Sequence, residues 1–319
     1  MSLFISSLFA AEYTIKITHV VSPNTPKGMG AEFFAKRVEE LSNGKIKVII
    51  FPNSQLYGDG DEMKAIKLGS VQMAMPSLSK FTSMVPEMQL FDLPFLFRDK
   101  EHVYKVLNGE VGQILKDKVT QKGFVALDYW DAGFKQLSSN KKAIVLPQDA
   151  QGQKFRVMNS PVLEAQFKTI GAVAQLLPFS EVYPALQQGI VDGSENPLSN
   201  FYTKKFYEVQ NSLTLTNHGY LGYLVIMNET FWKKLPNDLK PIVLQAMKEA
   251  TQYERQLAEK DDEAMIEKLQ EYAKTSGTFK IYTLSPEQKE VWHKAMEAVY
   301  PQFYDSVGEE LIKKVHAMQ

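Results

Sequence analysis

The sequence predicts an α/β protein of two domains, with a ligand cleft between them and a long helix that spans both. Strand-like and helix-like segments alternate along both halves, which is typical of a largely parallel sheet covered by helices. The length of 319 residues favours two domains over one. From Asp238 to about Ala273, apolar residues recur at helical spacing over a stretch long enough to touch both halves. No low-complexity linker separates the halves, and a cleft between such halves is the usual place for a small ligand.

The first half begins with an alternating segment, YTIKITHVV (13–21), which predicts a strand that ends at SPNTPKG. Residues 30–41 carry apolar side chains at helical spacing, and GKIKVIIFP (44–52) predicts a strand closed by proline. Further helices are expected over 61–67 and 102–118, and further strands over 71–75 and 124–129.

The second half repeats this alternation. Expected strands cover 155–158, 220–228 and 278–284, and expected helices cover 160–170, 180–188 and 238–273. Gly171 and Gly189 end two of these helices, and Ser180 is the expected N-cap of one. Ser285 followed by Pro286 predicts the start of a C-terminal helix.

Composition excludes several classes of protein. The formal net charge is −1 and no block of basic residues stands out, so nucleic acid is not an expected partner. The absence of cysteine excludes disulfides, thiolate metal sites and thiol redox motifs. After the N-terminus, no apolar run reaches the ~20 residues that a membrane helix requires.

The N-terminus, MSLFISSLFAAEYT, has an apolar run that ends in small residues, like the end of a secretory signal. Its charged first part is missing. We therefore interpret residues 1–11 as the remnant of a secretion signal and expect a periplasmic protein. A packed or unstructured N-terminal tail is the alternative.

Two catalytic or metal-site interpretations do not hold. SLSK (77–80), SSN (138–140) and KTSG (274–277) resemble β-lactamase motifs in order, but S-x-x-K recurs several times in this chain. GDGDE (58–62) resembles a calcium loop with misplaced ligands, and we interpret it as a turn whose acids favour the next helix. The five histidines are scattered, and no G-x-G-x-x-G or P-loop motif is present, so no metal and no cofactor are expected.

Arg156, in GQKFRVMNSPV, is a charged residue whose partner must be identified. It is one of only four arginines, and it stands in a short apolar run where a lone charge would be costly. A guanidinium can hold a carboxylate through two parallel hydrogen bonds. The partner is either a ligand or a protein acid such as Glu181 or Asp192, and the spacing alone does not decide.

Three other polar residues stand in comparable settings. Asn196 precedes a proline and offers both a donor and an acceptor, or it caps the next helix. Lys135 follows Phe134 in a possible strand crossing between the halves, and it either holds an anion or is a surface lysine. Lys27 lies at the start of the first helix, where anions are favoured, or is simply solvated.

A string of motifs in one order resembles a known family: the periplasmic solute-binding subunits of tripartite ATP-independent periplasmic (TRAP) transporters, C4-dicarboxylate or DctP type. The resemblance runs from about Glu12 to the C-terminus. Its motifs are PNSQLYGD (52–59), MAMPSLSKF (73–81), FDLPFLF (91–97), GFKQLSSNK (133–141), GQKFRVMNS (152–160), PFSEVYPALQQGIVDGSENP (178–197), NHGYLGY (217–223) and TLSPEQ (283–288).

The resemblance implies a periplasmic-binding-protein-like fold with crossing strands as the hinge. Domain I would comprise 12–132 plus 222–262, and domain II 133–221 plus 263–319. It also implies that Arg156 pairs with the ligand carboxylate and that Asn196 hydrogen-bonds nearby. Many members carry a second arginine where this chain has Lys135. Further wall residues would be Phe179, Ser77, Ser79, Tyr220 and Tyr223.

The function implied is capture of a C4-dicarboxylate such as malate, succinate or fumarate. Hinge closure would follow, and then delivery to the small and large membrane subunits of a TRAP transporter. The protein is expected to be a monomer and not an enzyme. The alternative is an enzyme acting on a small organic acid, with His218 or Glu181 as the base.

Overall fold

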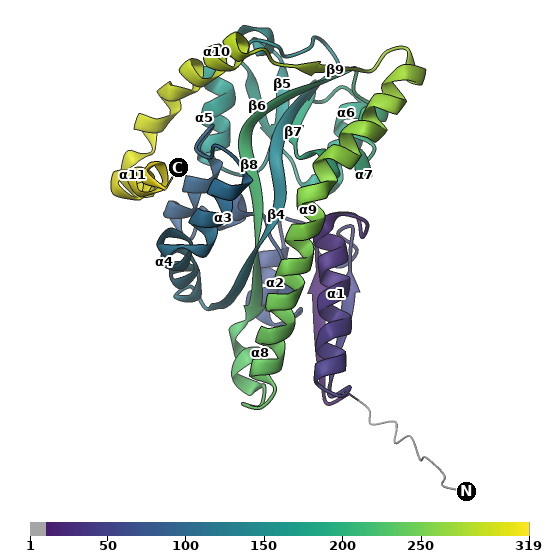
Figure 1. Ribbon diagram of the computed structural model, residues 1–319, viewed down its shortest axis with the longest axis vertical. Helices are drawn as coiled ribbons and strands as arrows, with labels where there is room; N and C mark the ends of the chain where they lie inside the picture. Colours follow the sequence, from purple (N-terminus) through teal and green to yellow (C-terminus); the bar gives the residue numbers. More distant parts are fainter. Residues whose placement is uncertain (1–10, 319) are drawn as a thin grey trace, which may run out of the picture.

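Two long antiparallel strands, β4 (Phe124–Ser139) and β8 (Ser212–Asn228), run through the middle of the molecule (Figure 1). The structure is a computed structural model that describes residues 11–318. The remnant of a secretion signal expected over 1–11 therefore lies, except for Ala11, outside the described residues. Both strands are far longer than the segments expected at 124–129 and 220–228.

One sheet of nine strands forms the frame of the described residues, in the order β2-β1-β3-β8-β4-β7-β5-β6, with β9 beside β8. The outer pairs β1–β2, β1–β3, β5–β6, β5–β7 and β8–β9 are parallel. The pairs β3–β8, β4–β8 and β4–β7 are antiparallel. The expectation of a largely parallel sheet is thus wrong for the centre, because β4 and β8 each cross from one half to the other.

The remaining strands are short and stand at the two ends of this ladder. They are β1 (Tyr13–Thr18), β2 (Ile46–Phe51), β3 (Met73–Ala74), β5 (Lys154–Val157), β6 (Val173–Leu176), β7 (Gly193–Asn196) and β9 (Lys280–Thr283). The α-helices cover both faces. They are α1 (Pro26–Leu41), α2 (Glu62–Leu68), α3 (Lys100–Asn108), α4 (Glu110–Thr120), α5 (Pro161–Thr169), α6 (Val182–Gln187), α7 (Leu198–Thr203), α8 (Glu229–Lys234), α9 (Lys240–Ser276), α10 (Pro286–Met296) and α11 (Glu309–Ala317).

Short helical turns complete the chain. They are η1 (Leu78–Phe81), η2 (Pro86–Asp92), η3 (Pro147–Ala150), η4 (Phe179–Glu181), η5 (Phe206–Glu208), η6 (Glu297–Gln302) and η7 (Tyr304–Gly308). The helix expected over 102–118 is two helices, since Gly109 ends α3 and caps α4.

Helix caps decide where the site-bearing elements begin. The Thr25 hydroxyl accepts the Gly28 N–H at 3.1 Å and Pro26 follows as the first helical residue, so α1 starts four residues before the expected Gly30. This places Lys27 in its first turn. Ser285 caps α10 as expected, whereas the expected cap Ser180 lies inside η4 and α6 begins at Val182.

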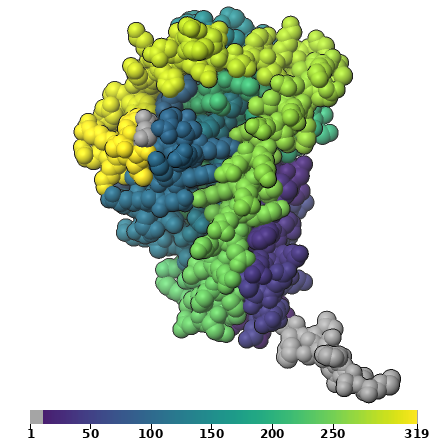
Figure 2. Space-filling model, viewed as in Figure 1, coloured from purple at the N-terminus to yellow at the C-terminus, as the bar shows by residue number. Residues whose placement is uncertain are grey.

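Helix α9 is the long helix expected near 238–273, and it runs along nearly the whole molecule, from α8 to β9. Figure 2 shows it lying against α1 on one face. The rings of Phe33 and Tyr253 stack 4.7 Å apart between these two helices. Trp130 on β4 donates to the Thr251 hydroxyl at 2.9 Å, so α9 is tied to the central ladder as well. No helix within residues 11–318 is long and apolar enough to cross a membrane.

Gly28 is held in a close backbone approach. A Cβ atom at this position would lie 2.4 Å from the Pro23 carbonyl oxygen, whereas a Cβ at Gly60 would meet nothing within 4 Å. We predict that Gly28→Ala lowers the free energy of unfolding by about 1–3 kcal/mol, because the turn before α1 must shift. Urea denaturation measures this. Gly60→Ala is the control, and equal stability of the two variants would contradict the prediction.

Candidate ligand-binding site

A narrow cavity is lined by residues from both halves of the chain. Six of the nine residues predicted for the site line it: Lys27, Ser77, Arg156, Phe179, Asn196 and Tyr223. They come from α1, the loop before η1, β5, η4, β7 and β8, so the cavity is assembled from segments far apart in the chain. Its volume is about 30 Å³, space for about two or three water molecules.

Arg156 is buried, with 3% of its surface exposed, at the edge of this cavity. Its Nε donates to the Leu177 carbonyl oxygen at 2.9 Å, while Nη2 is buried without a hydrogen-bond partner. The nearest acid is Asp59, whose Oδ2 is 3.7 Å from Nη2, which is an electrostatic contact but too long for a hydrogen bond. Burial lowers the pKa of the Arg156 guanidinium, though such a group stays charged.

Asp59 forms a long ion pair with Arg156 but accepts no hydrogen bond from it, and its two oxygens also serve other groups. Oδ2 is 3.0 Å from the Lys80 ammonium, and Oδ1 accepts the Phe179 N–H at 3.1 Å. The alternative partners considered from the sequence, Glu181 and Asp192, form no ion pair with Arg156. The guanidinium therefore keeps Nη2 as a buried donor without a hydrogen-bond partner.

Lys27 is a second buried cation in the same cavity, with 2% of its surface exposed. Its ammonium donates to the Met75 carbonyl oxygen at 3.1 Å and lies 3.6 Å from the centre of the Tyr223 ring. No carboxylate of the described residues lies within ion-pair distance of it. Burial lowers the pKa of Lys27 to about 8, and nearby acids, Glu62 first, oppose that shift. An ammonium with spare donors can take an anionic group.

Neutral polar groups complete the wall. The Ser77 hydroxyl donates to the Met158 sulfur at 3.3 Å, and the Asn196 amide donates to the Ser194 hydroxyl at 3.2 Å. The Phe179 ring lies 5.7 Å from the Arg156 guanidinium carbon. These side chains leave hydrogen-bonding capacity beside the two cations.

Lys135 does not lie in this cavity. Its ammonium is fully buried and 2.7 Å from Glu195 Oε1, and the second Glu195 oxygen is 2.8 Å from His218 Nε2. Burial alone would raise the pKa of Glu195, but the Lys135 charge and the His218 hydrogen bond lower it to about 2. The protein itself neutralises Lys135, so the structure gives no support to the expectation that it holds a second ligand anion.

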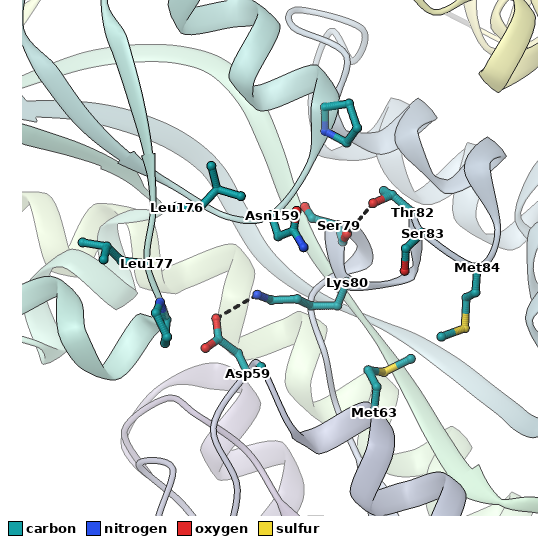
Figure 3. A pocket seen from close by; sticks show the side chains of 13 residues that line it. Asp59, Met63, Ser79, Lys80, Thr82, Ser83, Met84, Asn159, Leu176 and Leu177 are labelled. Carbon is teal, nitrogen blue, oxygen red and sulfur yellow. Dashed lines mark hydrogen bonds and ion pairs between the residues drawn. The ribbon is translucent and has the colours of Figure 1, made fainter.

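Ser79 and Tyr220 also lie outside the cavity. Ser79 donates to Asp92 at 2.7 Å and lines a neighbouring groove, where Lys80 reaches across to Asp59 (Figure 3). The Tyr220 ring packs edge-on against Phe97 inside the core. The groove, about 460 Å³, is larger than the cavity, but its lysine is already paired. The two buried cations without a hydrogen-bonded carboxylate line the smaller cavity.

Sequence reasoning missed three polar residues of the cavity: Asp59, Glu62 and Asn200. Asp59 and Glu62 belong to GDGDE, interpreted as a turn before a helix, which it is. Glu62 is nevertheless 1% exposed, and burial raises the pKa of its carboxyl to about 7. Asn200 donates to the Tyr223 hydroxyl at 3.2 Å from the short helix α7. A single buried acid just after a turn leaves no periodic signal in the sequence.

The candidate bases of the enzyme alternative do not reach the cavity. His218 is buried against Glu195, and Glu181 is exposed at the start of α6. Residues 11–318 contain no group of three or more side chains suited to hold a metal ion. The cavity is lined by two cations, by amide and hydroxyl groups and by the carboxyl groups of Asp59 and Glu62, and its lining residues include no base paired with a nucleophile.

A comparison with family profiles decides between these classes. Residues 17–306 match the profile of the family "Bacterial extracellular solute-binding protein, family 7" (DctP). The chain belongs to this family. The resemblance inferred from the motifs is confirmed, and the protein is a solute-binding protein and not an enzyme.

This chain is similar to curated relatives and solved structures of the DctP family over nearly their full length. The C4-dicarboxylate-binding periplasmic protein DctP of Rhodobacter capsulatus is 43% identical over 97% of this chain and 91% of its own. A TRAP periplasmic solute-binding protein from Sulfurospirillum deleyianum, solved with succinate, is 76% identical with a TM-score of 0.96, covering 97% of this chain and 100% of its own. One from Pseudomonas aeruginosa, solved with L-malate, is 39% identical with a TM-score of 0.84, covering 91% and 99%. The predicted two-domain α/β fold class is confirmed.

The buried ion pair predicts a stability effect. Glu195→Gln leaves Lys135 buried without a counter-charge, so we expect the free energy of unfolding to fall by about 3–5 kcal/mol. Because the pKa of Glu195 lies below its ordinary 4.5, the ionised carboxylate stabilises the fold above that pH and loses its effect as pH falls towards 2. Urea denaturation at neutral pH measures the loss.

The control for this measurement is Glu271→Gln, which breaks the exposed pair with Lys274 and is expected to cost less than about 1 kcal/mol. A loss at Glu195 no larger than that of the control would mean that the buried pair does not stabilise the fold.

Proposed function

We propose that this protein captures a C4-dicarboxylate outside the cytoplasm and holds its two carboxylates on Arg156 and Lys27. The observation that carries the proposal is the pair of buried cations at one cavity, neither hydrogen-bonded to a protein carboxylate. A dianion supplies both missing charges. Asn196 and Ser77 stand at the same wall and add neutral hydrogen bonds.

The relatives favour this chemistry. The Sulfurospirillum protein carries succinate at 76% identity, and a Shewanella oneidensis protein at 42% identity carries succinate as well. A protein from Advenella mimigardefordensis, 32% identical, holds galactonate, so the family also accommodates sugar acids. We propose succinate, malate and fumarate as ligands of this chain, with succinate first because the most similar of these proteins holds it.

Electrostatics explains why two carboxylates would be required. A hydrogen bond to a charged group contributes roughly 1.5–3 kcal/mol net. Two anchored ends and the burial of the ligand can reach about −8 kcal/mol, or a Kd of about 1 μM. A monoacid of the same length would satisfy one cation and leave the other buried without a partner, which costs free energy.

Movement of the two lobes would admit the ligand, since the cavity has room for only about two or three waters. We propose that 12–132 with 222–262 and 133–221 with 263–319 move as the two lobes, with the crossing strands β4 and β8 as the hinge. Asp59 joins the lobes through its bond to the Phe179 N–H. Helix α9 spans both and would bend with them.

Membership of the family suggests how the bound acid would be delivered. We propose that the closed, loaded form docks on the small and large membrane subunits of a TRAP transporter and releases the acid there. The protein would act in the periplasm as a monomer, exported by a signal of which residues 1–11 are the remnant. The relatives named periplasmic binding proteins support this location.

The two-cation site is tested by thermal denaturation with succinate. We predict that succinate, malate and fumarate raise the Tm of the parent, because a ligand at 100 times its Kd stabilises by about 2.7 kcal/mol, and that butyrate raises it far less. Arg156→Ala and Lys27→Met each abolish the succinate shift. Arg98→Ala, at an exposed arginine paired with Asp99, is the control and keeps it. A full shift in folded Arg156→Ala would refute the proposal.

A further inference from the structure

Glu62 has no role in the two-cation site as described so far, yet it lines the same cavity. It lies in the first turn of α2, is 1% exposed, and its Oε2 atom is buried without a hydrogen-bond partner. No cation of the described residues lies within ion-pair distance of it. A carboxylate buried in this way is costly, and a second carboxylate brought by a ligand would increase the cost.

We propose that Glu62 is a ligand-binding residue that acts in its protonated form, donating its Oε2–H to a carboxylate oxygen of the bound diacid. Capture of the diacid therefore takes up a proton from solvent. This inference rests on the proposed function, and it adds a third anchor that is a carboxylic acid.

In the empty protein, burial and the Asp59 charge favour the neutral form of Glu62, and the nearby cations Lys27 and Lys80 oppose them. The charged or titratable groups that face Glu62 come from five neighbouring segments: Lys27 in α1, Asp59 before α2, Lys80 in η1, Arg156 in β5 and Tyr223 in β8. Lys27, Lys80 and Arg156 are cations and Asp59 is an anion, and Glu254 and Lys204 also act on Lys27. A dianionic ligand beside Glu62 brings like charge to its carboxyl and so favours the neutral form.

Burial is the main factor that sets the pH at which the Glu62 carboxyl ionises in the empty protein. It raises the pKa of Glu62 to about 7, with Lys27 opposing and Asp59 reinforcing the shift. His19, beside Lys27, stays neutral because burial lowers its pKa to about 3. A bound dianion raises the pKa of Glu62 further, since like charges disfavour ionisation. The raised pKa in the complex means that affinity is full below about pH 7 and falls as pH rises above it.

Lys27 would also take up a proton when an anion binds, so the experiment must separate its contribution from that of Glu62. Its pKa of about 8 in the empty protein would rise when an anion binds, which also takes up a proton. The substitution Glu62→Gln removes only the Glu62 contribution. Glutamine keeps the size and a hydrogen-bond donor, so it mimics the protonated acid at every pH.

Isothermal titration calorimetry with succinate tests the proposal. Titrations at about pH 7.5 in phosphate and in Tris, which differ in ionisation enthalpy, count the protons taken up on binding. We expect the parent to take up more than about half a proton and Glu62→Gln to take up less than half as much as the parent. Between about pH 7 and about pH 8.5, the Kd of the parent should rise about tenfold more than that of Glu62→Gln.

Asp61→Asn is the matched control, since Asp61 is the exposed acid immediately before Glu62, and it should keep the parent's proton uptake. Binding by the parent without proton uptake would overturn the proposal even if Glu62→Gln failed to fold. An unchanged uptake in folded Glu62→Gln would also overturn it. Absence of any succinate binding by the parent would instead refute the proposed function, so the two failures are distinguishable.

Discussion

The arrangement around Arg156 is the constraint on which the site depends. Its guanidinium is buried, donates through Nε to the Leu177 carbonyl, and keeps Nη2 without a hydrogen-bond partner. Asp59 is near enough to soften the cost of burial but is committed to Lys80 and to the Phe179 N–H. A buried donor left open costs roughly 1–3 kcal/mol or more, and the proposed ligand carboxylate would recover that free energy. Lys27 is the second buried cation, and we propose that it holds the second carboxylate of the ligand in the same way.

Much of the fold could be predicted from the sequence, because periodicity and caps are local. Thr25, Pro26 and Ser285 fix helix starts through bonds within one turn, although the start of α1 was placed too late. The lengths of β4 and β8 could not be predicted. Bulges interrupt the pairing of these strands, one of them beside Gly133 at φ +98°, and break the alternation that a strand pattern requires. Their antiparallel pairing is a long-range property that no local pattern reports.

The lining of the cavity was predicted in part, and the rest again depends on long-range packing. Motif resemblance located Arg156 and Asn196, and the helix-start argument located Lys27. Lys135 looked equivalent in the sequence, but Glu195 from β7 neutralises it in the interior. Whether a buried lysine is neutralised by the protein or left for a ligand depends on which carboxylate packs beside it. Glu62 was missed because an acid before a helix has an ordinary explanation at the N-terminus of that helix.

The most direct measurement of the central claim is a crystal structure of this protein grown with succinate. The account predicts one succinate carboxylate within hydrogen-bond distance of the Arg156 guanidinium, with Nη2 as a donor, and the other beside the Lys27 ammonium. Asp59 should remain on Lys80. A structure with succinate bound elsewhere, or with Asp59 moved onto Arg156 in a direct two-bond pair, would contradict the account.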